Sequence, residues 1–153
     1  MSRELTKISG RYVNSEAIGA DALNLPSILN HTDIVRPVFL ILENTLGTIE
    51  GDYKKLLDIV CDQARIRGGE LVLSLFRQQA LSPWGISMYK TMVDMIGEPD
   101  LKQTNIEGGL YVSKTGYLSK WWSDDDVRVL KNLGFVVAES HAEEYYLIRM
   151  GFK

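Results

Sequence analysis

Two groups of polar residues that could do chemistry each follow a short stretch with strand character. Asp21 comes after residues 16–20, and Glu43-Asn44-Thr45 comes directly after the apolar run 38–42. In open parallel sheets, ligands bind beyond the carboxyl ends of the strands, so polar side chains at these two places are candidates for a binding site. A carboxylate accepts hydrogen bonds, whereas the Asn44 amide both donates and accepts them. The amide could therefore orient an amine or carboxylate nucleophile.

Each of these residues also has a purely structural interpretation. Asp21 could form an Asx turn or begin a helix, and Asn44-Thr45 could simply shape the turn after the strand. Glu43 could be a solvated loop acid. Both interpretations remain open at the level of the sequence. If the chemical one holds, Asp21 and Asn44 are expected to line one pocket at the carboxyl ends of neighbouring or nearly neighbouring strands.

The elements that would position these residues follow from hydrophobic spacing. The continuous apolar run 38–42 predicts a strand buried on both faces, as in a parallel sheet with helices above and below. Apolar residues at helical spacing predict a helix over about 52–67, which ends at Gly68-Gly69. A second buried strand is predicted at 71–76. Strand, helix and strand together form a βαβ unit with a right-handed crossover.

The residue pattern in the second half of the chain predicts two further helices and a final pair of strands. Ser82-Pro83 begins a helix that runs to about Gly97, and the glycine-dotted stretch 101–120 is a loop or short hairpin. Ser123 caps a helix that carries three acids in its first turn. Strands at 135–138 and 145–150 form an antiparallel pair. We predict a single domain over residues 1–153, in which residues 1–15 are flexible or rearranged.

This order of elements resembles the class I S-adenosylmethionine-dependent methyltransferases, and the resemblance spans residues 16–152. Residues 19–25 are similar to the segment that meets the adenine of the cofactor, and residues 39–49 to the strand and turn of small-molecule N-methyltransferases. Gly68-Gly69 resembles the approach to the next strand of that family. Residues 117–123, followed by 133–135, are similar to the usual ending, in which a helix stops at Gly-Phe before the last hairpin.

The resemblance implies a fold class and a function. The fold would be α/β, a three-layer sandwich whose mostly parallel sheet ends in a C-terminal antiparallel hairpin, that is, a partial Rossmann-like methyltransferase fold. The function would be methyl transfer from S-adenosylmethionine to a small-molecule acceptor, with this chain carrying the substrate-side half. One alternative is a non-catalytic binding or interaction protein on a truncated scaffold. Another is a parallel α/β domain unrelated to methyl transfer.

The resemblance also implies roles for individual residues. The catalytic residues would be Asn44 and Glu43, and the cofactor-binding residues would be Asp21, Ala22, Leu23 and Asn44. Substrate would be bound by Thr45, Tyr111, Tyr117 and Trp121. Structural interpretations stand beside these roles too, because Trp121 could pack over the sheet edge and the two tyrosines could belong to the core or the surface.

Two departures from the family pattern weaken the cofactor site. The glycine-rich loop that cradles the methionine moiety has no counterpart, and the acid that holds the ribose is absent as well. Glu43 also stands where many relatives have glycine. We therefore expect the isolated chain to bind the cofactor weakly or not at all. The missing strands would leave an open edge at the strand 38–42, which residues 1–20 could cover by folding back. We favour association instead, as a homo-oligomer or with a partner chain that supplies the strands.

Composition excludes several other classes of protein. The formal net charge of −3 gives no nucleic-acid footprint, and no apolar run approaches the roughly 18 residues that span a bilayer. The two histidines, His31 and His141, have no second ligand at metal-binding spacing, so no metal site is predicted. A single cysteine, Cys61, fits a reducing compartment, and we expect a cytoplasmic protein.

Overall fold

The computed structural model describes residue 18, residues 20–49 and residues 53–153. The chain divides into two compact units, Met1–Asp33 and Ile34–Lys153. Residues 1–15, and most of the strand expected at 16–20, lie outside the described residues. The single domain over residues 1–153 stays a prediction.

The described part of the first unit is helical. A 3₁₀ turn, η1 (Ala22–Asn24), leads directly into the short helix α2 (Leu25–Asn30). Asp21 is the N-cap of η1, and its carboxylate accepts a hydrogen bond of 2.9 Å from the backbone N–H of Leu23. Of the two interpretations of Asp21, the helix-start role is therefore the one observed within this unit.

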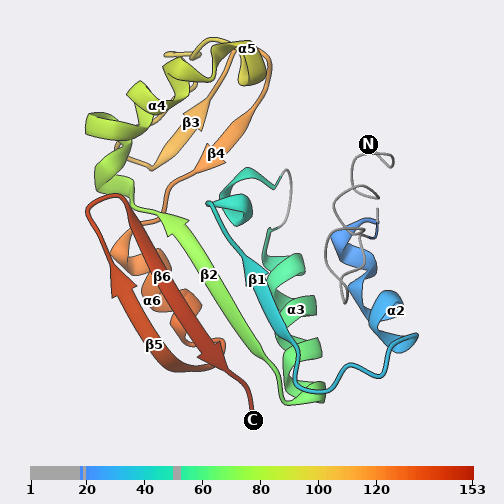
Figure 1. Cartoon of the computed structure of the whole chain (residues 1–153). Coiled ribbons are helices and arrows are strands. Elements are labelled where there is room, and N and C mark those ends of the chain that lie inside the picture. The colour runs from blue at the N-terminus through green and yellow to red at the C-terminus, as the bar shows by residue number, and fades with distance from the viewer. Residues whose placement is uncertain (1–17, 19, 50–52) are drawn as a thin grey trace. The chain divides into compact units, whose positions relative to one another are not determined.

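A mixed sheet forms the centre of the second unit (Figure 1). Its spatial order is β1 (Val38–Ile41), β2 (Glu70–Phe76), β6 (Tyr145–Gly151) and β5 (Phe135–His141). β1 pairs with β2 in parallel, and β6 lies antiparallel between β2 and β5. The predicted parallel pair and the terminal antiparallel pair are both present. The unit is thus α/β with a mixed sheet.

The helices α3 (Tyr53–Arg67) and α6 (Asp124–Lys131) cover one face of this sheet. Toward them the sheet presents alternate side chains that are fully buried, namely Leu71, Leu73, Leu75, Ile148 and Met150. α6 begins with a capping box, in which the Ser123 hydroxyl accepts from the backbone of Asp126 and the Asp126 carboxylate accepts from the backbone of Ser123. The helix start predicted at Ser123 is confirmed.

The second face of the sheet carries apolar side chains that stay exposed. Val38 is 55% exposed and Leu40 is 61% exposed, although the continuous apolar run predicted a strand buried on both faces. That part of the prediction is wrong for β1, because a run of apolar residues does not by itself provide a second covering layer. The described elements of this unit form two layers, the sheet and its helices. The third layer of the expected sandwich is not among them.

Residues 77–122 form an insert between β2 and α6 with a small core of their own. It contains the turns η3 (Gln78–Ala80) and η4 (Leu81–Gly85), the helices α4 (Ile86–Thr91) and α5 (Val93–Ile96), and the hairpin of β3 (Leu110–Val112) with β4 (Leu118–Lys120). The single helix predicted over 82–97 is interrupted at Met92, whose φ of −107° and ψ of 14° are not helical. The turn η2 (Thr45–Thr48) joins β1 to the chain that precedes α3.

Candidate functional site

A cavity of about 660 Å³ lies at the carboxyl ends of β1 and β2, on the exposed face of the sheet. Cross-strand pairing explains how its floor forms, because Phe76 lies opposite Tyr145 and Ser74 lies opposite Leu147. The lining consists of Leu42, Glu43, Ser74, Phe76, Trp84, Met88, Glu144, Tyr145 and Leu147. The volume falls in the range typical of small-molecule sites, and the position is the one at which open sheets bind ligands.

Glu43 reaches this cavity from a strained turn. Both Glu43 (φ 54°) and Asn44 (φ 56°) adopt the left-handed backbone conformation, which is uncommon outside glycine. Such residues cost of order 1–3 kcal/mol each and persist only where their surroundings hold them. Glu43 is exposed, so its carboxylate is open to solvent and to a ligand in the cavity. Of the residues predicted to be functional, Glu43 is the one that lines this cavity.

Asn44 holds the turn in place. Its side chain is fully buried and makes four hydrogen bonds: the amide donates to Ser119 Oγ at 3.1 Å and to the Lys120 carbonyl at 3.0 Å. The amide oxygen accepts from the Phe76 backbone N–H at 3.1 Å and from Trp122 Nε1 at 2.9 Å. An asparagine side chain has no further donor or acceptor to offer. The structure thus gives Asn44 a structural role and leaves it no free group for the predicted contact with cofactor or substrate.

The buried network continues from Asn44 into the insert. Tyr89 donates its hydroxyl hydrogen to Ser119 Oγ at 2.7 Å, and Trp121 Nε1 donates to the Tyr89 oxygen at 3.1 Å. Burial raises the pKa of Tyr89 well above its usual value, so this hydroxyl stays protonated. Close to the network, a Cβ on Gly47 would lie 2.3 Å from the Lys120 carbonyl oxygen, which explains the glycine there.

The aromatic residues predicted to bind substrate belong mostly to the core of the insert. Trp121 and Tyr111 are both 0% exposed, and Tyr111 stacks on Tyr89 with ring centroids 3.9 Å apart. Tyr117 is half-buried and meets Tyr89 edge-on at 5.9 Å. None of the three predicted aromatic residues lines the cavity. Their apolar surface is used in packing, which is the structural interpretation that the sequence had left open.

The remaining predicted residues lie in two places. Thr45 is exposed beside the turn, and its hydroxyl donates to the Leu42 carbonyl at 2.6 Å. Asp21, Ala22 and Leu23 belong to the first unit, where Asp21 caps η1. Their expected contact with the cofactor, and the pocket expected between Asp21 and Asn44, stay predictions.

The aromatic wall of the cavity was not identified from the sequence as part of a site. Trp84 and Met88 come from η4 and α4, four residues apart, so they share one face of the helical segment. Met88 also packs against the core of the insert. The signal that was available is this i, i+4 pair beside Pro83, directly after the predicted strand whose carboxyl end forms the cavity.

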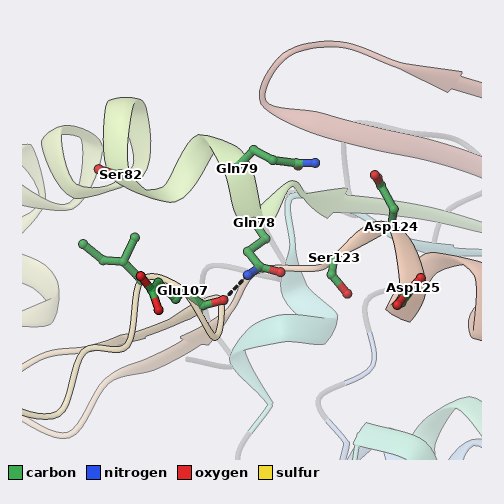
Figure 2. A pocket seen from close by; sticks show the side chains of 8 residues that line it. Gln78, Gln79, Ser82, Glu107, Ser123, Asp124 and Asp125 are labelled. Carbon is green, nitrogen blue, oxygen red and sulfur yellow. Dashed lines mark hydrogen bonds between the residues drawn. The ribbon is translucent and has the colours of Figure 1, made fainter.

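A second cavity, of about 470 Å³, lies at the start of α6 (Figure 2). Figure 2 shows the Gln78 side chain reaching the backbone oxygen of Glu107, with Asp124 and Asp125 at the first turn of the helix. Asp124 accepts a hydrogen bond from the Tyr146 hydroxyl, and Ser123 belongs to the capping box. Ser123 therefore begins the helix, and Asp124 connects its first turn to β6. Within the described residues, no three His, Cys, Asp or Glu side chains cluster as metal ligands would.

A comparison with known proteins shows that this chain shares its fold with a solved structure. No family model matches the chain, and no curated protein matches it. The crystal structure of the PH0226 protein from Pyrococcus horikoshii OT3 is similar to this chain, with a TM-score of 0.58 and 16% sequence identity. The match covers 99% of this chain and 65% of that one, so the chain spans less than two thirds of its neighbour's length. At this identity the similarity concerns the fold alone.

In the described part of the chain, no helix has the length and apolar character needed to cross a bilayer.

Proposed function

We propose that this chain carries the acceptor side of an S-adenosylmethionine-dependent methyltransferase domain that acts on a small molecule. The observation that supports the proposal best is the cavity at the carboxyl ends of β1 and β2, with Glu43 at its rim. Leu42 and Glu43 at this rim belong to residues 39–49. The resemblance assigns these residues to the strand and turn of small-molecule N-methyltransferases. A parallel pair followed by a terminal antiparallel hairpin, as the family pattern requires, is consistent with this assignment.

Methyl transfer depends mainly on holding the acceptor atom in line with the methyl group. The cavity has the parts for positioning. Phe76, Trp84 and Met88 provide apolar walls, and the Ser74 hydroxyl and the Glu43 carboxylate can fix the orientation of a polar acceptor. In this proposal Glu43 accepts a hydrogen bond from the acceptor and orients it.

The residues present fit the cofactor itself poorly. Asn44 has all of its hydrogen-bonding capacity engaged within the protein, and one carboxylate oxygen of Asp21 caps η1. S-adenosylmethionine would supply the methyl group when bound, but the Asn44 amide has no free group with which to hold it. The saturation of Asn44 favours the second candidate function, a non-catalytic small-molecule binding protein on the same scaffold.

A methyl-transfer assay separates the two functions. The tagged protein, expressed in its own host and purified with the chains that accompany it, would be given radiolabelled S-adenosylmethionine and a fractionated extract of small metabolites. We expect label to enter a small-molecule fraction, and Glu43→Ala to lower the rate by about 100-fold, the scale of a lost positioning contact. Glu143→Ala is the matched control, because Glu143 is an exposed acid that does not line the cavity. A native preparation that transfers no label to any fraction would overturn the proposal.

A further inference from the structure

We propose that the cavity at the carboxyl ends of β1 and β2 selects an organic cation, an amine or a quaternary ammonium group. The assignment of an amine ligand as a methyl acceptor, which would react through its neutral form, rests on the function proposed above, whereas the preference for binding a cation does not. The preference follows from the side chains that line the cavity and from their charges.

The walls of the cavity suit a cation of low charge density. Phe76 and Trp84 are half-buried and meet edge-to-face, with ring centroids 5.4 Å apart, and Tyr145 is 43% exposed beside them. The faces of aromatic rings carry negative charge, so they attract alkylammonium groups as well as apolar surface. The polarizable thioether of Met88 completes this wall.

The charged residues that line the cavity are both acidic. Glu43 and Glu144 both line it, and no Lys, Arg or His does. In the described part of the chain, neither carboxylate takes part in an ion pair, although other acids such as Glu70 and Glu98 do. A cation in the cavity would therefore gain the attraction of two carboxylates that form no ion pair within the described residues. An anion of the same size would be repelled.

A polar group on the floor of the cavity adds a point of orientation. Ser74 is half-buried in the middle of β2, and its position opposite Leu147 places it on the cavity side of the sheet. Its hydroxyl can accept a hydrogen bond from an N–H or donate one to a hydroxyl of the ligand. The cavity thus combines aromatic faces, carboxylates and one hydroxyl, which together favour a small amino alcohol or alkylammonium ion over a neutral or acidic ligand.

Choline and its neutral isostere, 3,3-dimethylbutan-1-ol, form a matched pair of probes for this preference. Binding of each to the purified full chain would be measured by calorimetry and by quenching of tryptophan fluorescence, without S-adenosylmethionine. We expect choline to bind at least about 10-fold more tightly than the alcohol, which corresponds to about 1.4 kcal/mol. We also expect its affinity to fall as ionic strength rises, because the carboxylates are near the surface.

Substitutions then locate the site. Glu43→Gln is expected to weaken choline binding about 5-fold or more while leaving the alcohol unchanged, and Trp84→Leu should weaken choline more than the alcohol. Glu143→Gln removes the same charge outside the lining, and we expect it to have little effect. Circular dichroism of each variant verifies that the fold is retained. The proposal is overturned if choline and its isostere bind with equal affinity. It is also overturned if no binding is detected at choline concentrations up to about 100 mM.

The outcome separates this inference from the proposed function. Selective choline binding without methyl transfer would retain the cation site and refute the methyltransferase. Methyl transfer to a neutral or acidic acceptor, with no preference for choline, would refute the cation site and retain the methyltransferase.

Discussion

Asn44 shows how one side chain can hold together segments that are distant in the sequence. Its partners lie in β2 and in residues 119–122, so its amide ties the end of β1 to the insert. The same hydrogen bonds keep Asn44 and Glu43 in the left-handed conformation. Glu43 can therefore be presented to the cavity because its neighbour is fully engaged in the protein.

Replacement of Asn44 by alanine should be strongly destabilising. Asn44→Ala would remove the hydrogen-bond partner of the buried Trp122 indole and of the part-buried Phe76 N–H and Lys120 carbonyl, and a buried group left unpaired costs about 1–3 kcal/mol. We expect a total loss of about 3–5 kcal/mol in the free energy of unfolding, measured by urea denaturation. Thr45→Ala removes one exposed hydrogen bond in the same turn and should cost less than about 1 kcal/mol. An Asn44→Ala variant as stable as Thr45→Ala would contradict the structural role.

At the scale of the element, α6 depends on interactions at its first turn. Burial by itself would raise the pKa of Asp126, but the hydrogen bonds from the Ser123 backbone and hydroxyl and from Lys120 outweigh it. The pKa of this carboxyl in the folded protein therefore lies below its usual value. The capping box is complete only while Asp126 is ionised.

The lowered pKa makes the stability of α6 dependent on pH. Because the folded-state pKa lies below the unfolded-state value, the contribution is fully present above about pH 4 and is lost as the pH falls through the folded-state pKa. We expect the wild-type protein to lose stability in that window relative to Asp126→Asn, as followed by urea titrations at several pH values. Asp125→Asn, in the same first turn but outside the capping box, is the control. Parallel pH profiles for wild type and Asp126→Asn would refute this expectation.

At the scale of the whole molecule, β1 is the edge strand of the sheet formed by the described residues. There it pairs only with β2, and its side chains Val38 and Leu40 are exposed. Such an edge promotes pairing between chains. We propose that a second copy of the chain covers it.

Sedimentation tests this association. The protein is expected to sediment as a species larger than its 17.3 kDa monomer, and Leu40→Lys should shift it toward the monomer, because an inserted charge blocks edge pairing. Met95→Lys places the same charge at an exposed residue of α5, away from the sheet, and should leave the association unchanged. A wild-type monomer at every concentration would rule out self-association.

The isolated chain should also bind S-adenosylmethionine weakly. With Asn44 engaged in the protein and no glycine-rich loop in the sequence, several polar contacts of about 1 kcal/mol each are missing, which lowers affinity by orders of magnitude. Calorimetry on the purified chain should detect no binding tighter than about 1 mM. Micromolar affinity would show that other residues form the cofactor site.

Much of the architecture was predictable because its signals are local. The spacing of apolar residues predicted α3 and β2, and the Ser123 cap with its acids predicted α6, since each of these signals lies within a few residues of the element it specifies. The terminal strands were predicted in the same way. Glu43 was likewise found at the end of an apolar run, and it is the predicted residue that lines the cavity.

The roles of the other site residues depended on contacts across the fold. Asn44 meets Ser119 at a separation of 75 residues, and no periodicity in the sequence tells which long-range partner will saturate an amide. Likewise, an aromatic side chain such as Trp121 has the same local pattern whether it lines a pocket or fills a core. Hydrophobic spacing shows which side of an element is apolar, whereas burial depends on what packs against that side. For this reason β1 was predicted correctly as a strand but wrongly as one buried on both faces.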